Sequence, residues 1–143
     1  MEAELEPPQI IGATPGGTRR IYYAKRGSFQ GPQMTGELLS GGGDWSLNRT
    51  DGTYVLDVRC ILKTEKEDLI YVNYRGYIYL QSGEVKQHRQ GEKQNLGKYY
   101  LRTAPFFETS SKEYDWLNRV LAIGVGEYYE DQYKVSYNVY QIS

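Results

Sequence analysis

The feature that most constrains the fold is a series of short segments whose side chains alternate between two faces, separated by glycines and prolines. The clearest segment runs from Tyr54 to Lys63, and the next from Leu69 to Leu80. Successive side chains of a β-strand point to opposite faces, so a period of two predicts strands. Several such strands at hairpin spacing favour a β-sandwich or a β-barrel.

The composition agrees with this fold class. Tyrosine contributes 15 of the 143 residues, against 3 Phe and 2 Trp. Tyrosine favours strands and combines an apolar ring with a polar tip. A chain of this length predicts a single domain over residues 1–143. We expect residues 1–18, which contain Pro7, Pro8 and Pro15, to be extended or partly disordered.

The remaining elements follow from the same patterns. Strands are expected at about 9–11, 19–26, 34–39, 98–107, 120–128 and 133–142, with a turn at 27–32 and a polar loop at 81–97. The total is about eight strands. Ser110 and Glu113 have the spacing of a capping box, which predicts one short helix ending near Asn118. Gly76 inside a strand predicts a bulge or a sharp bend.

The charges exclude several classes of protein. Lys and Arg number 17 and Asp and Glu number 18, so the basic excess of a nucleic-acid or membrane-surface binder is missing. No apolar run is long enough for a transmembrane helix, and the acidic start does not resemble a signal peptide.

The single cysteine, Cys60, lies in an apolar strand pattern. We therefore expect an inert thiol in a cytoplasmic protein.

Familiar catalytic centres lack their residues. One His and one Cys leave no zinc site, and we expect neither a metal nor a cofactor. His88 lies in the polar loop, which does not suit a catalytic triad. Gly41–Gly43 lacks the Lys and Ser or Thr of a phosphate-binding loop.

The order and spacing of several short motifs resemble domain-of-unknown-function family 3237, a family of small microbial proteins. The resemblance covers about Arg20 to Val139. It depends on Gly27-x-Phe29-x-Gly31-Pro32, Gly42-Gly43-Asp44-Trp45, Asp51-Gly52, Asp57-Val58-Arg59, Tyr100-x-Arg102-Thr103-x-Pro105-x-Phe107-Glu108-Thr109 and Tyr114-x-Trp116-Leu117-Asn118. One departure is the turn at Lys66-Glu67-Asp68, where the family often has Asp-Gly.

The resemblance implies a single closed antiparallel β-barrel of the calycin or allene-oxide-cyclase type, often a homodimer. It also implies a cofactor-independent isomerase or cyclase acting on a small aromatic or polyketide-like metabolite. The alternative is a non-catalytic protein that binds a small molecule in the same cavity. A fold does not decide between these functions.

Asp44 follows three glycines, which allow backbone conformations closed to other residues. A carboxyl with a pKa raised by burial could act as a general acid and base. It could equally serve as a hydrogen-bond acceptor in a turn. Tyr74 has an apolar strand face around it and could donate its hydroxyl to an oxyanion.

Asp57 and Arg59 share one face of their strand. The opposite face is more apolar, which would place the two charges outside the barrel. In a small barrel, however, the cavity can carry the polar groups. We predict that Arg59 points inward, either in an ion pair with Asp57 or bound to a ligand anion.

The remaining candidates are aromatic residues and a second arginine. Arg102 has the same two options as Arg59, and Tyr100 and Phe106 share its face. Trp45 and Trp116 are either core anchors or platforms for a ligand. The predicted catalytic residues are Asp44, Arg59, Tyr74 and Arg102, and the predicted substrate-binding residues are Trp45, Asp57, Tyr100, Phe106 and Trp116.

Overall fold

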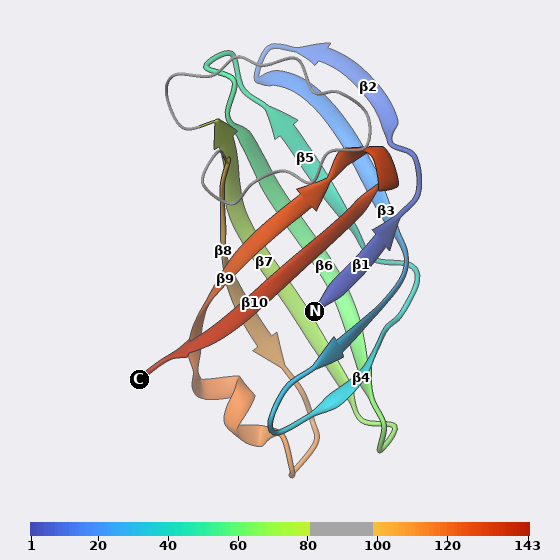
Figure 1. Cartoon of the computed structure of the whole chain (residues 1–143), viewed down its shortest axis with the longest axis vertical. Helices are drawn as coiled ribbons and strands as arrows, with labels where there is room; N and C mark the ends of the chain where they lie inside the picture. The colour runs from blue at the N-terminus through green and yellow to red at the C-terminus, as the bar shows by residue number, and fades with distance from the viewer. Residues whose placement is uncertain (81–98) are drawn as a thin grey trace.

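The computed structural model describes residues 1–80 and 99–143, so the loop predicted at 81–97 lies outside the described residues. The described chain is an all-β, closed antiparallel barrel (Figure 1). Its strands are β1 (Glu2–Leu5), β2 (Gln9–Thr14), β3 (Gly17–Gln30), β4 (Thr35–Leu38), β5 (Gly43–Asn48), β6 (Tyr54–Thr64), β7 (Leu69–Leu80), β8 (Tyr99–Glu108), β9 (Leu121–Tyr129) and β10 (Lys134–Ile142). Two short 3-10 helices are η1 (Asp115–Arg119) and η2 (Glu130–Gln132).

The strands form a ring of eight places. Neighbours in the ring are β1, β10, β9, β8, β7 and β6, followed by a place that β4 and β5 share, and then β3, which returns to β1. β4 pairs with the later halves of β3 and β6, and β5 pairs with their earlier halves. β2 pairs with β3 alone. The predicted closed barrel of about eight strands is therefore confirmed.

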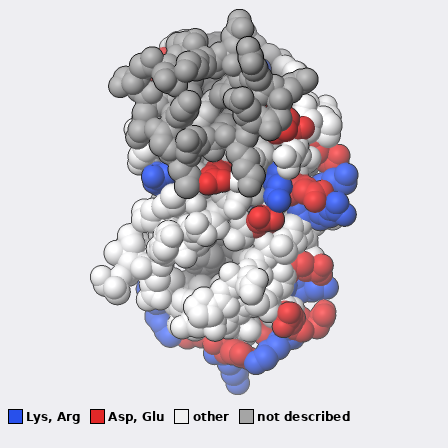
Figure 2. Space-filling model, viewed as in Figure 1, with Lys and Arg blue, Asp and Glu red and all other residues white. Residues whose placement is uncertain are grey.

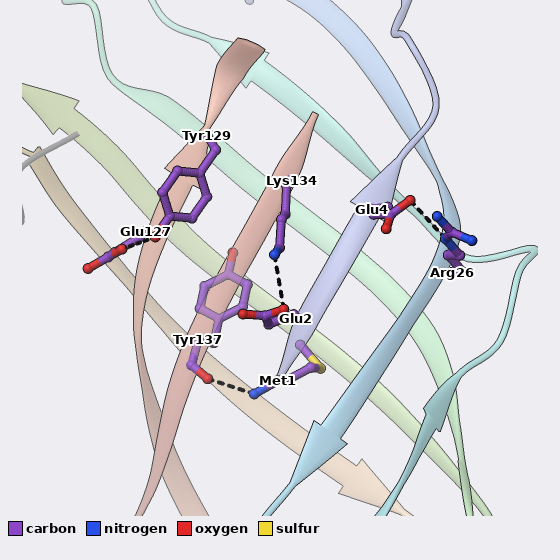
Figure 3. A network of polar contacts seen from close by, with 8 residues as sticks. All are labelled: Met1, Glu2, Glu4, Arg26, Glu127, Tyr129, Lys134 and Tyr137. Carbon is purple, nitrogen blue, oxygen red and sulfur yellow. Dashed lines mark hydrogen bonds and ion pairs between the residues drawn. The ribbon is translucent and has the colours of Figure 1, made fainter. Parts of the chain in front are cut away.

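β1 closes the ring. It pairs with β10 on one side and with β3 on the other, with Ala3 opposite both Val135 and Gly27. Ion pairs flank the two ladders: Glu2 to Lys134 at 3.0 Å, and Glu4 to Arg26 at 2.8 Å (Figure 3). These pairs are exposed and each contributes little to stability, so the closure depends mainly on the backbone hydrogen bonds and on the burial of Ala3.

The core lies inside the barrel and follows the predicted alternation. In β6, Leu56, Val58, Cys60 and Leu62 are each at most 8% exposed. Ile70, Val72 and Tyr74 of β7 and Leu101 of β8 continue the layer. Removing these side chains from water is the main term that favours the folded barrel.

Several local predictions were wrong. β1 and β5 were not expected, and β3 continues to Gln30 through the predicted turn at 27–32. The predicted helix is only the 3-10 helix η1, which Tyr114 precedes without a side-chain cap, so the capping box of Ser110 and Glu113 does not form there. The register runs past Gly76 without a shift. A Cβ at Gly76 would meet the backbone oxygen of Arg102, so this glycine allows close strand approach instead of a bulge.

Gly27 tests the closure. A Cβ at this position would collide with the backbone of Glu2 and lie 3.1 Å from Ala3 Cα, so Gly27→Ala should push β1 away from β3. We expect a loss of about 1–3 kcal/mol in the free energy of unfolding, as for other overpacked sites. Chemical denaturation measures it. Gly31→Ala is the control, because its Cβ would meet only Met34 O at 3.6 Å. Equal stability of the two variants would contradict the role of Gly27.

Candidate functional site

A cavity of about 410 Å³ occupies one end of the barrel interior. Inward-facing side chains of β3, β5, β6, β7, β9 and β10 line it. Its apolar wall includes Leu56, Val58 and Ile78, and its polar groups include Arg20, Tyr22, Asp44, Ser46, Tyr54, Tyr74, Tyr128 and Tyr137. The volume falls within the usual range of small-molecule sites, about 300–1,000 Å³.

Asp44 reaches this cavity from the second residue of β5. β5 pairs with β6 at Asp44 and Val58, and again at Leu47 and Val55. Between these two paired positions, the Asp44 carboxylate accepts a hydrogen bond from the backbone N–H of Asp57, at 2.9 Å. Burial raises the pKa of Asp44 to about 7, and the Asp57 N–H opposes that rise. Asp44 is thus both an acceptor for the neighbouring strand and a carboxyl that exchanges a proton near neutral pH.

Arg20 lies on β3 opposite Ser46 of β5 and supplies a positive charge to the cavity. The hydrogen bond with the Tyr22 side chain is the main cause of the raised pKa of Arg20, and the charges of Tyr54 and Glu130 contribute less. The buried Nε atom of Arg20 has no hydrogen-bond partner among the described residues. A buried donor without a partner is costly in a folded protein, and a ligand oxygen would reach this nitrogen only after a shift of the Arg20 side chain, because the atom has almost no accessible surface.

Tyr74 and Tyr137 form the inner end of the cavity. Their rings meet edge to face with centroids 5.6 Å apart, and both side chains are buried. Burial raises the pKa of both hydroxyls, so both remain protonated donors. Gly126 makes room for Tyr137, since a Cβ there would lie 2.5 Å from the tyrosine ring. The strand glycine of β9 thus positions a cavity side chain on β10.

Cys60 also lines the cavity but is a poor nucleophile. Its side chain is buried, and burial raises the pKa of the thiol to about 12. The thiolate is the reactive form of cysteine, and it is scarce at neutral pH in this environment. The expectation of a buried free thiol is met.

The structure places Asp57, Arg59 and Trp45 outside the cavity, so the prediction that Arg59 points inward was wrong. The Arg59 side chain is 50% exposed and lies 3.5 Å from Asp57. Its guanidinium also covers the Trp45 ring at 5.5 Å, and Tyr23 meets that ring edge-on. Arginine finds both a carboxylate and an aromatic face here without entering the barrel.

Arg102, Tyr100 and Phe106 also lie on the outer face, contrary to prediction. Arg102 lies over the Tyr100 ring at 5.0 Å, and that ring stacks on Tyr79. Phe106 is 52% exposed. Trp116 of η1 lines a different cavity at the opposite end of the barrel. Of the nine predicted site residues, Asp44 and Tyr74 lie at the first cavity.

Sequence reasoning missed Arg20, Tyr22, Tyr54, Tyr128 and Tyr137. The four tyrosines of this group line the cavity, although none of them was among the predicted site residues. A signal was present for Tyr54, which shares the apolar face of β6 with Leu56 and Val58. Arg20 and Tyr22 likewise share one face of β3 with Ala24, which is buried.

Within residues 1–80 and 99–143, no group of three or more His, Cys, Asp or Glu side chains is placed to hold a metal ion. In the same described residues, no helix has the length and hydropathy needed to cross a lipid bilayer. What the cavity offers is a proton-exchanging carboxyl, a guanidinium and several phenol hydroxyls around an apolar wall.

A closed barrel with a polar cavity in one end defines this chain as a β-barrel protein with a candidate small-molecule site. It belongs to the family described as protein of unknown function DUF3237, whose model matches residues 1–142. A UPF0311 protein of Clostridium acetobutylicum is 30% identical over 114 residues, which cover 79% of this chain and 72% of that protein. The resemblance found in the sequence motifs is therefore confirmed.

Solved structures show the same fold. A β-barrel-like protein from Acinetobacter baumannii matches with a TM-score of 0.87 and 31% identity, over 99% of this chain and 90% of the other. A conserved protein from Rhodopseudomonas palustris matches with a TM-score of 0.88 and 27% identity, over 99% and 92%. An enzyme from Penicillium herquei has a TM-score of 0.69 and 22% identity, over 99% and 90%, a likeness of fold alone.

The pKa of Asp44 makes a prediction for stability. Its folded pKa lies above the ordinary 3.8, so the folded protein binds the extra proton and loses stability as pH rises from about 3.8 to about 7. Asp44→Asn keeps an acceptor for the Asp57 N–H and removes this loss. The unfolding free energy of the variant relative to the parent should therefore increase by a few kcal/mol between pH 4 and pH 8.

Thermal unfolding at several pH values measures this difference. Asp131→Asn, which removes an exposed carboxylate, is the control and should show little pH-dependent difference from the parent. If the unfolding free energy of Asp44→Asn depends on pH in the same way as that of the parent between pH 4 and pH 8, the carboxyl is not desolvated as described.

Proposed function

We propose that the protein is a cofactor-independent isomerase or cyclase acting on a small aromatic or polyketide-like metabolite bound in the first cavity. The observation that carries this proposal is the Asp44 carboxyl, which lines a cavity and has a pKa of about 7. A general acid or base works best when its pKa is close to the operating pH, because both protonation states are then populated.

The proposed chemistry moves a proton without a redox change. Ionised Asp44 takes a proton from an acidic C–H or O–H of the substrate and returns it at another position after the bonds have rearranged. The negative charge that develops on a substrate oxygen is stabilised by the guanidinium of Arg20, which lines the cavity. Tyr74 supplies a neutral hydroxyl at the inner end.

The lining of the cavity supports the proposed substrate class. Tyr22, Tyr54 and Tyr128 present aromatic faces and hydroxyls around the cavity, which suits a ring system that carries oxygen atoms. The shape of the cavity would hold such a compound in a reactive conformation. The Penicillium herquei protein, described as an enzyme, indicates that this fold can carry a catalyst.

The second candidate function is non-catalytic binding of a small molecule. It is favoured by the hydrogen bond from Asp57 N–H, which gives the Asp44 carboxylate a structural role that requires no chemistry. The expected homodimer and cytoplasmic location remain predictions under either function.

Deuterium exchange tests the proton transfer directly. The probe is 1-tetralone with its hydroxylated relatives, whose C–H groups next to the carbonyl exchange in D₂O and are followed by NMR. The parent protein should accelerate exchange, with a rate that rises through pH 7 as Asp44 ionises. Asp44→Asn should lose about 10²-fold or more of the acceleration, and Arg20→Met should weaken it.

Arg59→Met is the matched control, because it removes an arginine on the outer face and should change the rate less than twofold. Full exchange activity in Asp44→Asn would reject the catalytic assignment. Saturable binding of these ketones with no acceleration by the parent protein would favour the binding protein instead.

A further inference from the structure

A second cavity, of about 400 Å³, lies at the end of the barrel that holds η1 and the turn after β3. Phe29, Met34, Leu62 and Val72 form part of its wall, and Trp116 and Leu117 of η1 another part. It is almost as large as the first cavity and shares with it only Met1, Tyr74 and Tyr137. These three residues separate two compartments of one barrel.

The two compartments differ in charge. Arg20, Asp44, Asp51 and Glu130 line the first cavity. Among the described residues, no Lys, Arg, Asp, Glu or His side chain lines the second one, and the Met1 ammonium at its boundary already donates to the backbone oxygen of Tyr137 at 2.8 Å. A charged ligand group would lose its hydration there, and no charged side chain among the described residues would compensate for that loss. An uncharged apolar group gains free energy by leaving water.

The second cavity has a mouth because the ring is incomplete beside it. β1 pairs with β10 only from Lys134 to Ser136, so the rest of β10 has no described strand on that side. Val139 and Tyr140, which lie past the end of this pairing, line the cavity and are 44% and 56% exposed. Figure 2 shows the lower part of this view of the molecule as mostly uncharged and hollowed, with charged side chains gathered at its edges.

We propose that the second cavity binds an uncharged, largely aliphatic molecule with at most a hydroxyl or carbonyl group. The aliphatic part would contact Phe29, Leu62 and Trp116, together with the rings of Tyr74 and Tyr137. This site shares the Tyr74 side chain with the first cavity, but binding of an aliphatic ligand here does not depend on the proposed reaction at Asp44.

The chain contains its own reporter for this site. Of its two tryptophans, Trp116 lines the second cavity and Trp45 lies on the outer face. In Trp45→Phe, all tryptophan emission comes from Trp116, and a bromine atom in the cavity would quench it. The probes are ω-bromo-1-alkanols of increasing chain length. We expect saturable quenching, with a Kd that falls about fourfold per added methylene until the cavity is full.

Val139→Glu, made in the Trp45→Phe background, places a carboxylate at the mouth and should raise the Kd at least tenfold. Ile142→Glu is the matched control, because Ile142 is also exposed on β10, at 54% against 44% for Val139, but does not line the cavity, and its Kd should stay within twofold. Circular dichroism checks that both variants fold.

Three results would overturn the proposal. The first is quenching that rises linearly without saturation. The second is an equal loss of affinity in Val139→Glu and Ile142→Glu. The third is quenching that disappears as the protein concentration increases, since the mouth would then be an interface between copies of the chain. In Trp116→Phe, where Trp45 is the remaining tryptophan, quenching should increase linearly with the probe concentration and stay weak.

Discussion

The return of the hydrogen-bonded ladder to its own first strand is the constraint on which the rest of the molecule depends. β1 has only four residues, yet it joins β3 to β10 and converts an open sheet into a wall with an inside. The inward side chains described above face a packed core or a cavity because that ring is closed. The closure is also partial, since β1 covers only three residues of β10, and the uncovered remainder leaves one end of the barrel accessible.

The tyrosines allow a small barrel to place hydroxyl groups beside an internal cavity at a low cost in burial. A buried phenol fills space like an apolar ring and brings a single hydroxyl that stays neutral, so its burial costs far less than that of a charge. Tyr74 and Tyr137 use this property where the two cavities meet. Asp44 and Arg20 are among the charged groups beside them, and both have intermediate exposure.

The alternating segments predicted most strands, and β7 begins and ends where expected. They could not decide which side of β6 faces inward once charges occurred on one face, and the choice of Arg59 as an inward group was wrong. The burial of Leu56, Val58 and Cys60 outweighed any gain from an internal charge, while Trp45 gave Arg59 a partner outside. Asp44 was found because a carboxyl after three glycines is conspicuous. Arg20 was missed because its importance depends on β5 lying beside β3, and the sequence does not reveal this pairing.

The buried thiol of Cys60 can report how often the barrel opens. It is the single cysteine of the chain, its side chain is 4% exposed, and the high pKa of its thiol suppresses the reactive thiolate even if a small reagent enters the cavity. Alkylation of the native protein should therefore wait until the strands part. The rate at which this thiol is consumed would report how often the ring opens, and it would do so without an engineered label.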